Sequence, residues 1–323
     1  YRCFYCRDFG MITESLLKEG YVEEVRSTLH YALRIFSKRN YVATTILHNE
    51  PVDFFHFGSD SLPFLMRSLR LYSEHTQDHS LINTYQTFLQ GCVNHYYQKV
   101  YDQNTFLVKK NITLSGAKDH YKRRSSTYDN SAMIGLAIEI KKINTLAGTS
   151  FNYPISIQTS KQAMKRHLWS EKGGFYDDLD CEEHSTSDAN IFPYYWGIFT
   201  EKGMLHSSMK VIQEERLDRP YPIKYANYRN RQKEIAHLNL FTPNFEGTTI
   251  WLHTGLCYLE VLAKTDKKYC RKHLENIRQL IEAKKCSPEV LNNDKTCYRS
   301  WAYSSDDSMT WIIGYYHLYK QQV

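Results

Sequence analysis

The chain has 323 residues, of which 42% are hydrophobic and 24% are charged, so it is long enough to bury a large core and has the composition of a globular protein. No apolar run approaches the roughly 20 residues that a membrane-spanning helix needs, and the first residues lack the pattern of a signal peptide. The formal net charge of +6 is spread over short clusters such as Lys122-Arg123-Arg124, which we interpret as solvated helix ends. We therefore expect neither a membrane nor a nucleic acid as a partner.

The eight cysteines are too few to form a disulfide scaffold in a chain of this length. Cys92 and Cys257 lie in apolar helical runs, where a free thiol behaves as a small hydrophobic group. This pattern favours a reducing compartment, and we predict a cytoplasmic location. Cys3 and Cys6 have the spacing of a metal or redox pair, but no second pair lies near them in sequence, so we expect neither a metal nor a cofactor.

Hydrophobic residues recur at three- and four-residue steps through most of the chain, which predicts a mainly helical protein. Gly20 separates the first two helices, and Asp60 stands where its side chain would N-cap the third. The predicted helices cover about residues 11–18, 22–36, 60–72, 82–96, 127–146, 159–170, 189–200, 203–214, 247–264, 267–284 and 306–320.

Short turns alternate with long polar or aromatic connections between these eleven helices, as expected when helical hairpins pack side by side with their longer loops at one end. Strand signals are few and short, which argues against an α/β fold. The pattern predicts an all-α fold of one domain over residues 1–323, and a closed ring of such hairpins would be an (α/α)6 barrel. Because such a ring needs twelve helices, either a short helix lies in residues 40–58 or 101–120, or the opening helix lies upstream of Tyr1. We favour the second, since the chain begins in an aromatic segment typical of a loop, and an upstream domain is a separate open question.

Carboxylates in suitable loops point to hydrolytic chemistry, because glycoside hydrolysis uses a pair of carboxyl groups. Asp129 lies between small polar residues immediately before an apolar helical run. Glu289 follows Pro288, which fixes a turn and would place Glu289 in a loop rather than in a helix. Glu246 is the runner-up for the second carboxylate, and its alternative role is to stabilise the start of the helix that follows it.

Several loops combine aromatic with charged side chains, which is the composition of a sugar site, because flat apolar faces stack on pyranose rings while carboxylates and arginines bind hydroxyls. Arg7 and Asp8 fit this description, although they can also cap the first helix. Asp188 is either a helix N-cap or a substrate ligand, and Trp251 is either a stacking face or a core residue. The remaining candidates for substrate binding are Phe175, Tyr176, Asp177, Trp301, Tyr303 and Asp306.

Taken in chain order, these segments resemble the six-hairpin glycosidases, the group that includes glucoamylases, trehalases, processing α-glucosidases and the glucosidase part of glycogen-debranching enzymes. The resemblance spans nearly the whole chain, although each motif is short, and Cys6 stands where the family opens with a tryptophan. The matching stretches are Arg7-Asp8-Phe9-Gly10, Tyr128-Asp129-Asn130-Ser131, Gly173-Gly174-Phe175-Tyr176-Asp177, Gly247-Thr248-Thr249-Ile250-Trp251, Pro288-Glu289-Val290, Tyr303-Ser304-Ser305-Asp306 and Met309-Thr310-Trp311.

The resemblance implies an (α/α)6 barrel whose site lies among the loops at one end, with Asp129 as general acid and Glu289 as general base. It implies an inverting mechanism without a cofactor, for which the two carboxyl groups lie roughly 6.5 to 9.5 Å apart. The substrate would be a glycoside or short oligosaccharide, which we expect to be an α-glucoside. Arg7 and Asp8 would bind its hydroxyls, and the indole rings of the two candidate tryptophans would stack on it.

Two other functions stay open at this point. N-acylglucosamine epimerases also have an (α/α)6 barrel, but their chemistry needs paired acid and base groups, usually histidines, and the histidines of this chain show no such spacing. Conversion of a free monosaccharide without hydrolysis would identify that function. A barrel that only binds carbohydrate would bind oligosaccharides without turnover and without any dependence on Asp129.

Overall fold

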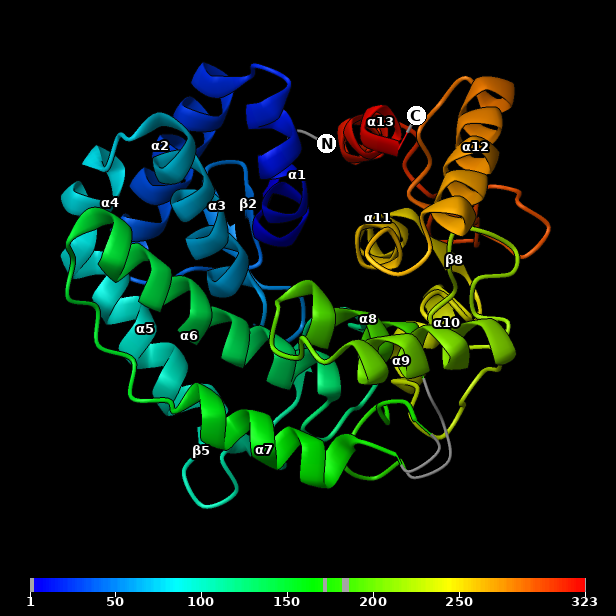
Figure 1. Cartoon of the computed structure of the whole chain (residues 1–323), viewed down its shortest axis with the longest axis horizontal. Helices are drawn as coiled ribbons and strands as arrows, with labels where there is room; N and C mark the ends of the chain where they lie inside the picture. The colour runs from blue at the N-terminus through cyan, green and yellow to red at the C-terminus, as the bar shows by residue number, and fades with distance from the viewer. Residues whose placement is uncertain (1–2, 171–172, 182–185, 323) are drawn as a thin grey trace. The chain divides into compact units, whose positions relative to one another are not determined.

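The computed structural model describes residues 3–170, 173–181 and 186–322, and it is mostly helical (Figure 1). Contacts between Cα atoms divide the chain into two compact units. Unit 1 comprises Tyr1–Gly116 and Asp129–Met164, and unit 2 comprises Ala117–Tyr128 and Lys165–Val323. None of the helices in the described ranges combines the length and the apolar character that crossing a lipid bilayer requires.

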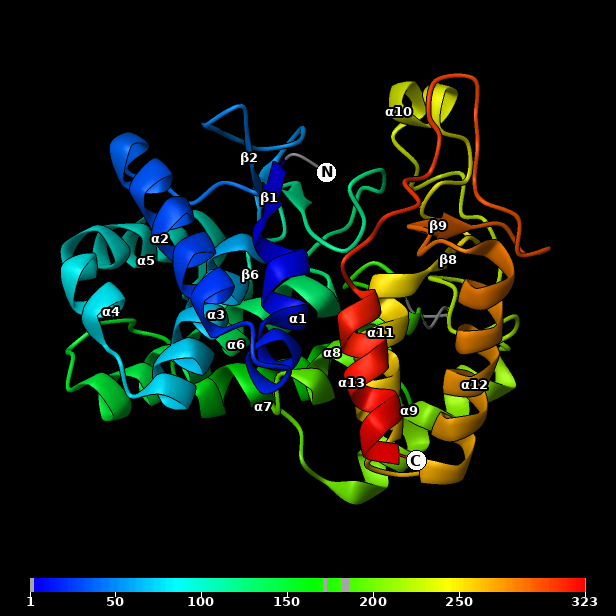
Figure 2. The same cartoon turned by 90° about the horizontal axis from the view of Figure 1, so that it is seen from above.

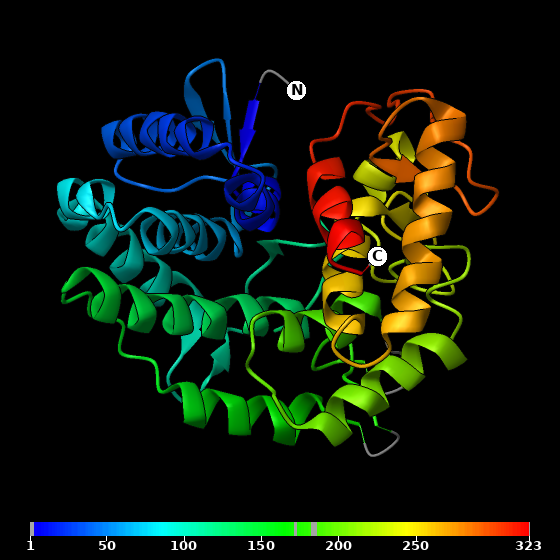
Figure 3. The ribbon, with the colours of Figure 1, turned by 45° about the horizontal axis from the view of Figure 1, so that its top comes forward.

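Unit 1 is built from helices that pack against one another (Figure 3). Most of their buried side chains are apolar, as expected for amphipathic helices. The first and third of them approach closely because Gly10 has no side chain, and a Cβ added there would lie 2.6 Å from Phe64 Cβ. The helices of this unit are α1 (Cys6–Lys18), α2 (Val22–Arg39), α3 (Ser61–Thr76), α4 (Ser80–Thr84) and α5 (Gln86–Val100), with parts of α6 (Thr127–Ala147) and α7 (Ile157–Leu168), which also have residues in unit 2.

The strands of unit 1 are two or three residues long; the first precedes α1, and the others lie in the connections between helices. His48 and Asn49 form the tip of a hairpin and have positive φ angles of 51° and 65°, as a two-residue hairpin turn requires. The antiparallel sheet that contains this hairpin has the order β1 (Cys3–Tyr5), β2 (Thr45–Leu47), β3 (Glu50–Val52). Two further sheets have two strands each. In the first, β4 (Phe57–Gly58) pairs in parallel with β7 (Leu114–Ser115), and in the second, β5 (Tyr101–Asp102) pairs antiparallel with β6 (Leu107–Val108).

Unit 2 is organised around α11 (Leu252–Leu262), which is almost entirely buried because other helices cover it on several sides. The helices α8 (Ser187–Tyr195), α12 (Lys267–Lys284) and α13 (Ile312–Gln322) pack against it (Figure 2). This unit also contains α9 (Lys202–Glu214), the short α10 (Ala236–Phe241), and the antiparallel pair β8 (Ile250–Trp251) and β9 (Val290–Leu291).

The structure confirms the mainly helical character with few and short strands, and it corrects three details of the sequence prediction. The helix predicted from residue 247 begins at Leu252, because the two residues before it pair with β9. The last helix begins at Ile312 rather than at residue 306. Of the two alternatives for a twelfth helix, a short helix in residues 40–58 or 101–120 is wrong, because these segments form strands and turns.

The contact between α1 and α3 gives a first testable prediction. Gly10→Ala should lower the free energy of unfolding by about 1 to 3 kcal/mol, because the added Cβ overlaps the Phe64 side chain. Gly91→Ala in α5 is the matched control: an added Cβ there meets nothing within 4 Å, so stability should stay equal or rise by about 1 kcal/mol. Urea unfolding followed by circular dichroism measures both variants, and equal midpoints would contradict the close helix contact.

Candidate active site

Asp129 lies in the first turn of α6 and is 4% exposed. Its Oδ1 is 2.5 Å from the hydroxyl oxygen of Ser59, which is also 3.1 Å from the carbonyl oxygen of Ser115. The position of Ser59 is fixed because its carbonyl accepts a hydrogen bond from the Tyr96 hydroxyl at 2.6 Å. The Ser59 hydroxyl donates to Asp129 Oδ1, and the Ser59 N–H donates to the Ser115 carbonyl at 2.8 Å. These contacts join the Asp129 carboxyl group to the backbone around Ser59 and Ser115.

Arg7 and Asp8 lie at the start of α1. The Nη1 atom of Arg7 is 3.3 Å from the carboxylate of Asp60 and donates to the carbonyl of Gly116. The expectation that Asp60 caps α3 is wrong, because its side chain makes no capping hydrogen bond and faces Arg7 instead. Asp8 stands where a carboxylate interacts favourably with the helix dipole, and its binding of substrate stays a prediction.

A buried group of charges in unit 2 surrounds Asp177. Three cations lie within 4 Å of its carboxylate: Arg123 at 3.5 Å, Lys233 at 3.7 Å and Lys118 at 3.8 Å. Asp188 is the second carboxylate of the group, at 2.6 Å from Arg123 and 3.7 Å from Lys118. Both carboxylates, Arg123 and Lys118 are at most 7% exposed, so these ion pairs are desolvated.

The group joins separate segments of unit 2. Arg123 comes from the segment before α6, and Asp188 comes from the first turn of α8. The interpretation of Asp188 as an N-cap is therefore wrong, because Thr186 occupies the cap position and the Asp188 carboxylate faces the cations. The interpretation of Lys122-Arg123-Arg124 as a solvated helix end is also wrong for Arg123, which is buried, although Arg124 is exposed.

The charges of this group determine the ionisation of its members. Burial raises the pKa of the Asp177 carboxyl, but the positive charges of Lys118, Arg123 and Lys233 outweigh burial and hold that pKa below its usual value. Burial lowers the pKa of Lys233, but Asp177 and Asp178 outweigh it and hold that pKa above its usual value. The lysine Nζ is 2.7 Å from Asp178 Oδ1. Asp177 and Lys233 are thus charged at neutral pH.

Glu246 is 3% exposed and accepts two backbone hydrogen bonds, from His120 at 2.6 Å and from Asp119 at 2.9 Å. Burial raises the pKa of its carboxyl above the usual value. Glu246, Asp177 and Lys118 are among the residues that line a cavity of about 20 Å³, which is room for about one water molecule. The sequence candidates Glu246 and Asp177 therefore face the same small cavity in unit 2.

Glu289 lies in the turn immediately before β9 and is partly exposed, so its predicted position in a loop is confirmed. Its Oε2 accepts a hydrogen bond from the Tyr303 hydroxyl and lies 3.4 Å from the backbone nitrogen of Asp306. The backbone N–H of Glu289 in turn donates to the Asp306 carbonyl at 2.8 Å. The fold thus brings together three of the sequence candidates, and it leaves the carboxylate accessible to water.

Two of the aromatic candidates lie in the core. Phe175 is fully buried, and Trp251 is 7% exposed, with its indole N–H donating to the Phe245 carbonyl at 3.0 Å. Packing accounts for both positions, and their stacking on a sugar stays a prediction. Tyr176 is partly exposed, and its carbonyl accepts from the Thr127 hydroxyl at 2.6 Å.

Trp301 differs from the other aromatic candidates because it is 72% exposed. Its indole N–H donates to the Leu240 carbonyl at 3.0 Å, and its ring centroid lies 5.0 Å from that of Phe241. An exposed indole ring that is fixed in this way offers a flat apolar face to a ligand.

Sequence reasoning misses Ser59, Lys118 and Lys233. Lys118 had a weak signal, since it stands in the polar segment before Asp129, but Ser59 had none, because its contact with Asp129 joins positions 70 residues apart. No group of three or more histidine, cysteine, aspartate or glutamate side chains in the described part of the chain is arranged to hold a metal ion.

One protein-family model matches part of the chain. Residues 99–232 match the family model described as Trehalase. This range contains Asp129 and both carboxylates of the buried group, Asp177 and Asp188. A comparison with curated protein sequences finds no match.

Solved structures of glycosidases share the fold of this chain. A mannosylglycerate hydrolase of glycoside hydrolase family 63 from Thermus thermophilus, in complex with glucose, has a TM-score of 0.67 at 10% identity, covering 99% of this chain and 94% of that chain. A rhamnosidase from Klebsiella oxytoca with bound rhamnose has a TM-score of 0.68 at 12% identity, covering 100% of this chain and 58% of that chain. A glycosidase in complex with glucose has a TM-score of 0.68 at 11% identity, covering 99% of this chain and 87% of that chain. The likeness confirms the predicted fold class, the all-α (α/α)6 barrel.

The ion pairs of Asp177 make the stability of the protein dependent on pH. Because the pKa of Asp177 is lower in the folded than in the unfolded chain, its contribution is complete above about pH 4, the pKa of an unfolded aspartate, and is lost as the pH falls below that value. Asp177→Asn should lower the free energy of unfolding at pH 7 by about 3 to 5 kcal/mol, because it leaves buried cations without their partner. It should also weaken the loss of stability below about pH 4.

Urea unfolding at a series of pH values measures both effects. Asp307→Asn is the control, since this carboxylate belongs to the same unit and is exposed, and its acid profile should match that of the parent protein. An unchanged stability of Asp177→Asn at pH 7 would show that the buried charges do not depend on this carboxylate.

Proposed function

We propose that this chain is a glycoside hydrolase of the six-hairpin superfamily that cleaves an α-glucoside or a short α-linked oligosaccharide with inversion of the anomeric centre. The observation that carries the proposal is Asp129, a buried carboxyl group held against a serine hydroxyl within the residues that match the Trehalase model. Two of the similar structures are described with bound glucose, which supports a glucoside as substrate.

In this proposal Asp129 is the general acid, which donates its proton to the glycosidic oxygen as the bond breaks. The Asp129 side chain is buried, and the Ser59 hydroxyl holds it in place by donating to Asp129 Oδ1. After the proton transfer, the same hydroxyl stabilises the carboxylate that is left. Ser59 therefore positions the acid in this proposal.

Glu289 is the general base in this proposal and deprotonates the water that attacks the opposite face of the sugar. Its carboxylate is partly exposed, and the Tyr303 hydroxyl orients it by donating a hydrogen bond. Glu246 is the runner-up, but its carboxylate is buried and accepts two backbone N–H groups, which favours a structural role. Accessibility to water therefore supports Glu289 over Glu246.

The proposed partner is the glycoside or oligosaccharide substrate, and the scheme uses no cofactor. The exposed ring of Trp301 would stack on a sugar unit, and Arg7 would bind hydroxyls. We also propose a cytoplasmic location, which agrees with the free thiols of buried residues such as Cys92 and Cys257.

Release of glucose from a panel of α-glucosides and short α-linked oligosaccharides tests the proposal. The parent protein should release the anomer of inverted configuration, as read by proton NMR immediately after cleavage. Asp129→Asn and Glu289→Gln should each reduce kcat by at least about 100-fold, because each removes an acid or base from the transition state. Asp102→Asn and Glu214→Gln are controls that make the same changes at an intermediate and an exposed carboxylate, and both should keep the parent rate.

The outcomes separate the alternatives. If Glu289→Gln is unimpaired and Glu246→Gln is inactive, the base is Glu246. If a retained anomer is released, the inverting scheme is wrong. If no glycoside is cleaved while a free monosaccharide is converted, the protein is an epimerase.

A further inference from the structure

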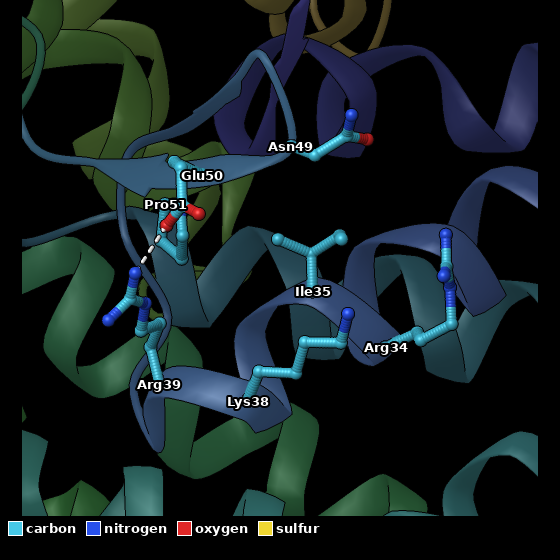
Figure 4. A pocket seen from close by; sticks show the side chains of 7 residues that line it. All are labelled: Arg34, Ile35, Lys38, Arg39, Asn49, Glu50 and Pro51. Carbon is cyan, nitrogen blue, oxygen red and sulfur yellow. Dashed lines mark hydrogen bonds and ion pairs between the residues drawn. The ribbon is translucent and has the colours of Figure 1, made fainter.

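Unit 1 contains a basic groove that takes no part in the proposed hydrolysis. The groove lies between the C-terminal half of α2 and the β2–β3 hairpin and has a volume of about 530 Å³ (Figure 4). This volume is within the range of sites that bind small molecules. The residues that line the groove are Arg34, Ile35, Lys38, Arg39, Asn49, Glu50 and Pro51.

Three cations and one carboxylate line this groove. Arg39 Nη2 lies 2.8 Å from Glu50 Oε2, and this ion pair joins α2 to β3 (Figure 4). Arg34 and Lys38 are four residues apart on the same face of α2, and neither forms an ion pair with another residue of the described chain. The groove therefore has an excess of two positive charges, both with N–H groups available to a ligand.

The stability of α2 does not account for this arrangement. Lys38 and Arg39 lie in the last turn, where cations interact favourably with the helix dipole, but Arg34 lies before that turn. The hairpin tip is also tied to the helix, because Asn49 Oδ1 accepts a hydrogen bond from the Tyr31 hydroxyl at 2.9 Å. That bond leaves the amide N–H groups of Asn49 as donors. The groove thus has one fixed side-chain amide at the hairpin tip, beside the helix that carries Arg34 and Lys38, and the Arg34 guanidinium lies 5.8 Å from the centroid of the Tyr31 ring.

The apolar surface of the groove comes mainly from Pro51 of β3, which is partly exposed, because Ile35 of α2 is only 3% exposed (Figure 4). Sugars present both an apolar C–H face and hydroxyls, and a phosphate group adds two negative charges that charge-assisted hydrogen bonds from arginine and lysine would neutralise. We propose that the groove is a binding site for a phosphorylated sugar, in which Arg34 and Lys38 hold the phosphate and Asn49 binds ring hydroxyls.

Isothermal titration calorimetry of the full chain with glucose 6-phosphate, glucose and inorganic phosphate tests this site. Glucose 6-phosphate should bind saturably, inorganic phosphate at least about tenfold more weakly, and glucose more weakly still, because each lacks one part of the recognised group. Arg34→Gln/Lys38→Gln should weaken the binding of glucose 6-phosphate by at least about tenfold. Lys268→Gln/Lys272→Gln is the matched control, since it removes two exposed charges at the same spacing on α12 and should leave binding unchanged.

Asn49→Asp is a second variant that keeps the fold. Aspartate also tolerates a positive φ and can accept the Tyr31 hydrogen bond, but it replaces a donor by a negative charge, so the affinity should fall by at least about tenfold. Circular dichroism and urea midpoints verify that all variants fold. Absence of saturable binding to the parent, full affinity in Arg34→Gln/Lys38→Gln, or inorganic phosphate binding as tightly as glucose 6-phosphate would each overturn the proposal. Because the readout is binding, it does not depend on the proposed hydrolysis.

Discussion

The buried ion pairs around Asp177 are the interaction on which the loop structure of unit 2 depends. Removing a charge from water costs several kcal/mol, so Lys118 and Arg123 can be buried only where carboxylates face them. That condition is met only when the segment before α6, the turn after Gly173 and the start of α8 lie together. Such ion pairs stabilise the folded state little more than apolar packing would. They select one arrangement of these segments, because any other arrangement would leave a buried charge without its partner.

The candidate carboxyl groups show how one chain gives chemically similar groups different properties. Asp177 faces three cations, and its pKa lies below the usual value, whereas Glu246 faces the same cavity with backbone donors and its pKa lies above the usual value because burial dominates. Asp129 is also buried, and its carboxyl group contacts a neutral hydroxyl. Hydrolysis by two carboxyl groups requires such differences, since one group must give a proton while the other accepts one.

The sequence predicts the helices well because burial imposes a regular spacing on apolar residues, and this spacing survives in helices such as α2 and α12. Boundaries that depend on distant partners could not be predicted, since only pairing with β9 separates the strand β8 from the apolar run of α11. The same limit applies to the candidate site. The polar run around Asp129 could be recognised from its composition, but Ser59, which contacts its carboxyl group, lies 70 positions away. The neighbours of Asp188 in sequence predict either a helix cap or a substrate ligand, but its partner Arg123 is 65 positions away. Partners of this kind follow from the tertiary structure alone.

Glu246 and Glu289, the two candidates for the base, differ in their hydrogen-bond partners and in their access to water. Glu246 accepts two backbone N–H groups beside a cavity with room for about one water. Burial there raises the pKa of its carboxyl group. The Glu289 carboxylate accepts hydrogen bonds from the Tyr303 hydroxyl and the Asp306 N–H, and the Glu289 N–H donates to the Asp306 carbonyl. The turn before β9 therefore determines the position of Glu289. A base must reach an attacking water and must be regenerated by solvent after each cycle, and a partly exposed carboxylate on an ordered turn satisfies both requirements. The β8–β9 pairing, which fixes that turn to the start of the buried helix α11, is thus as important to the proposed mechanism as the carboxylate itself.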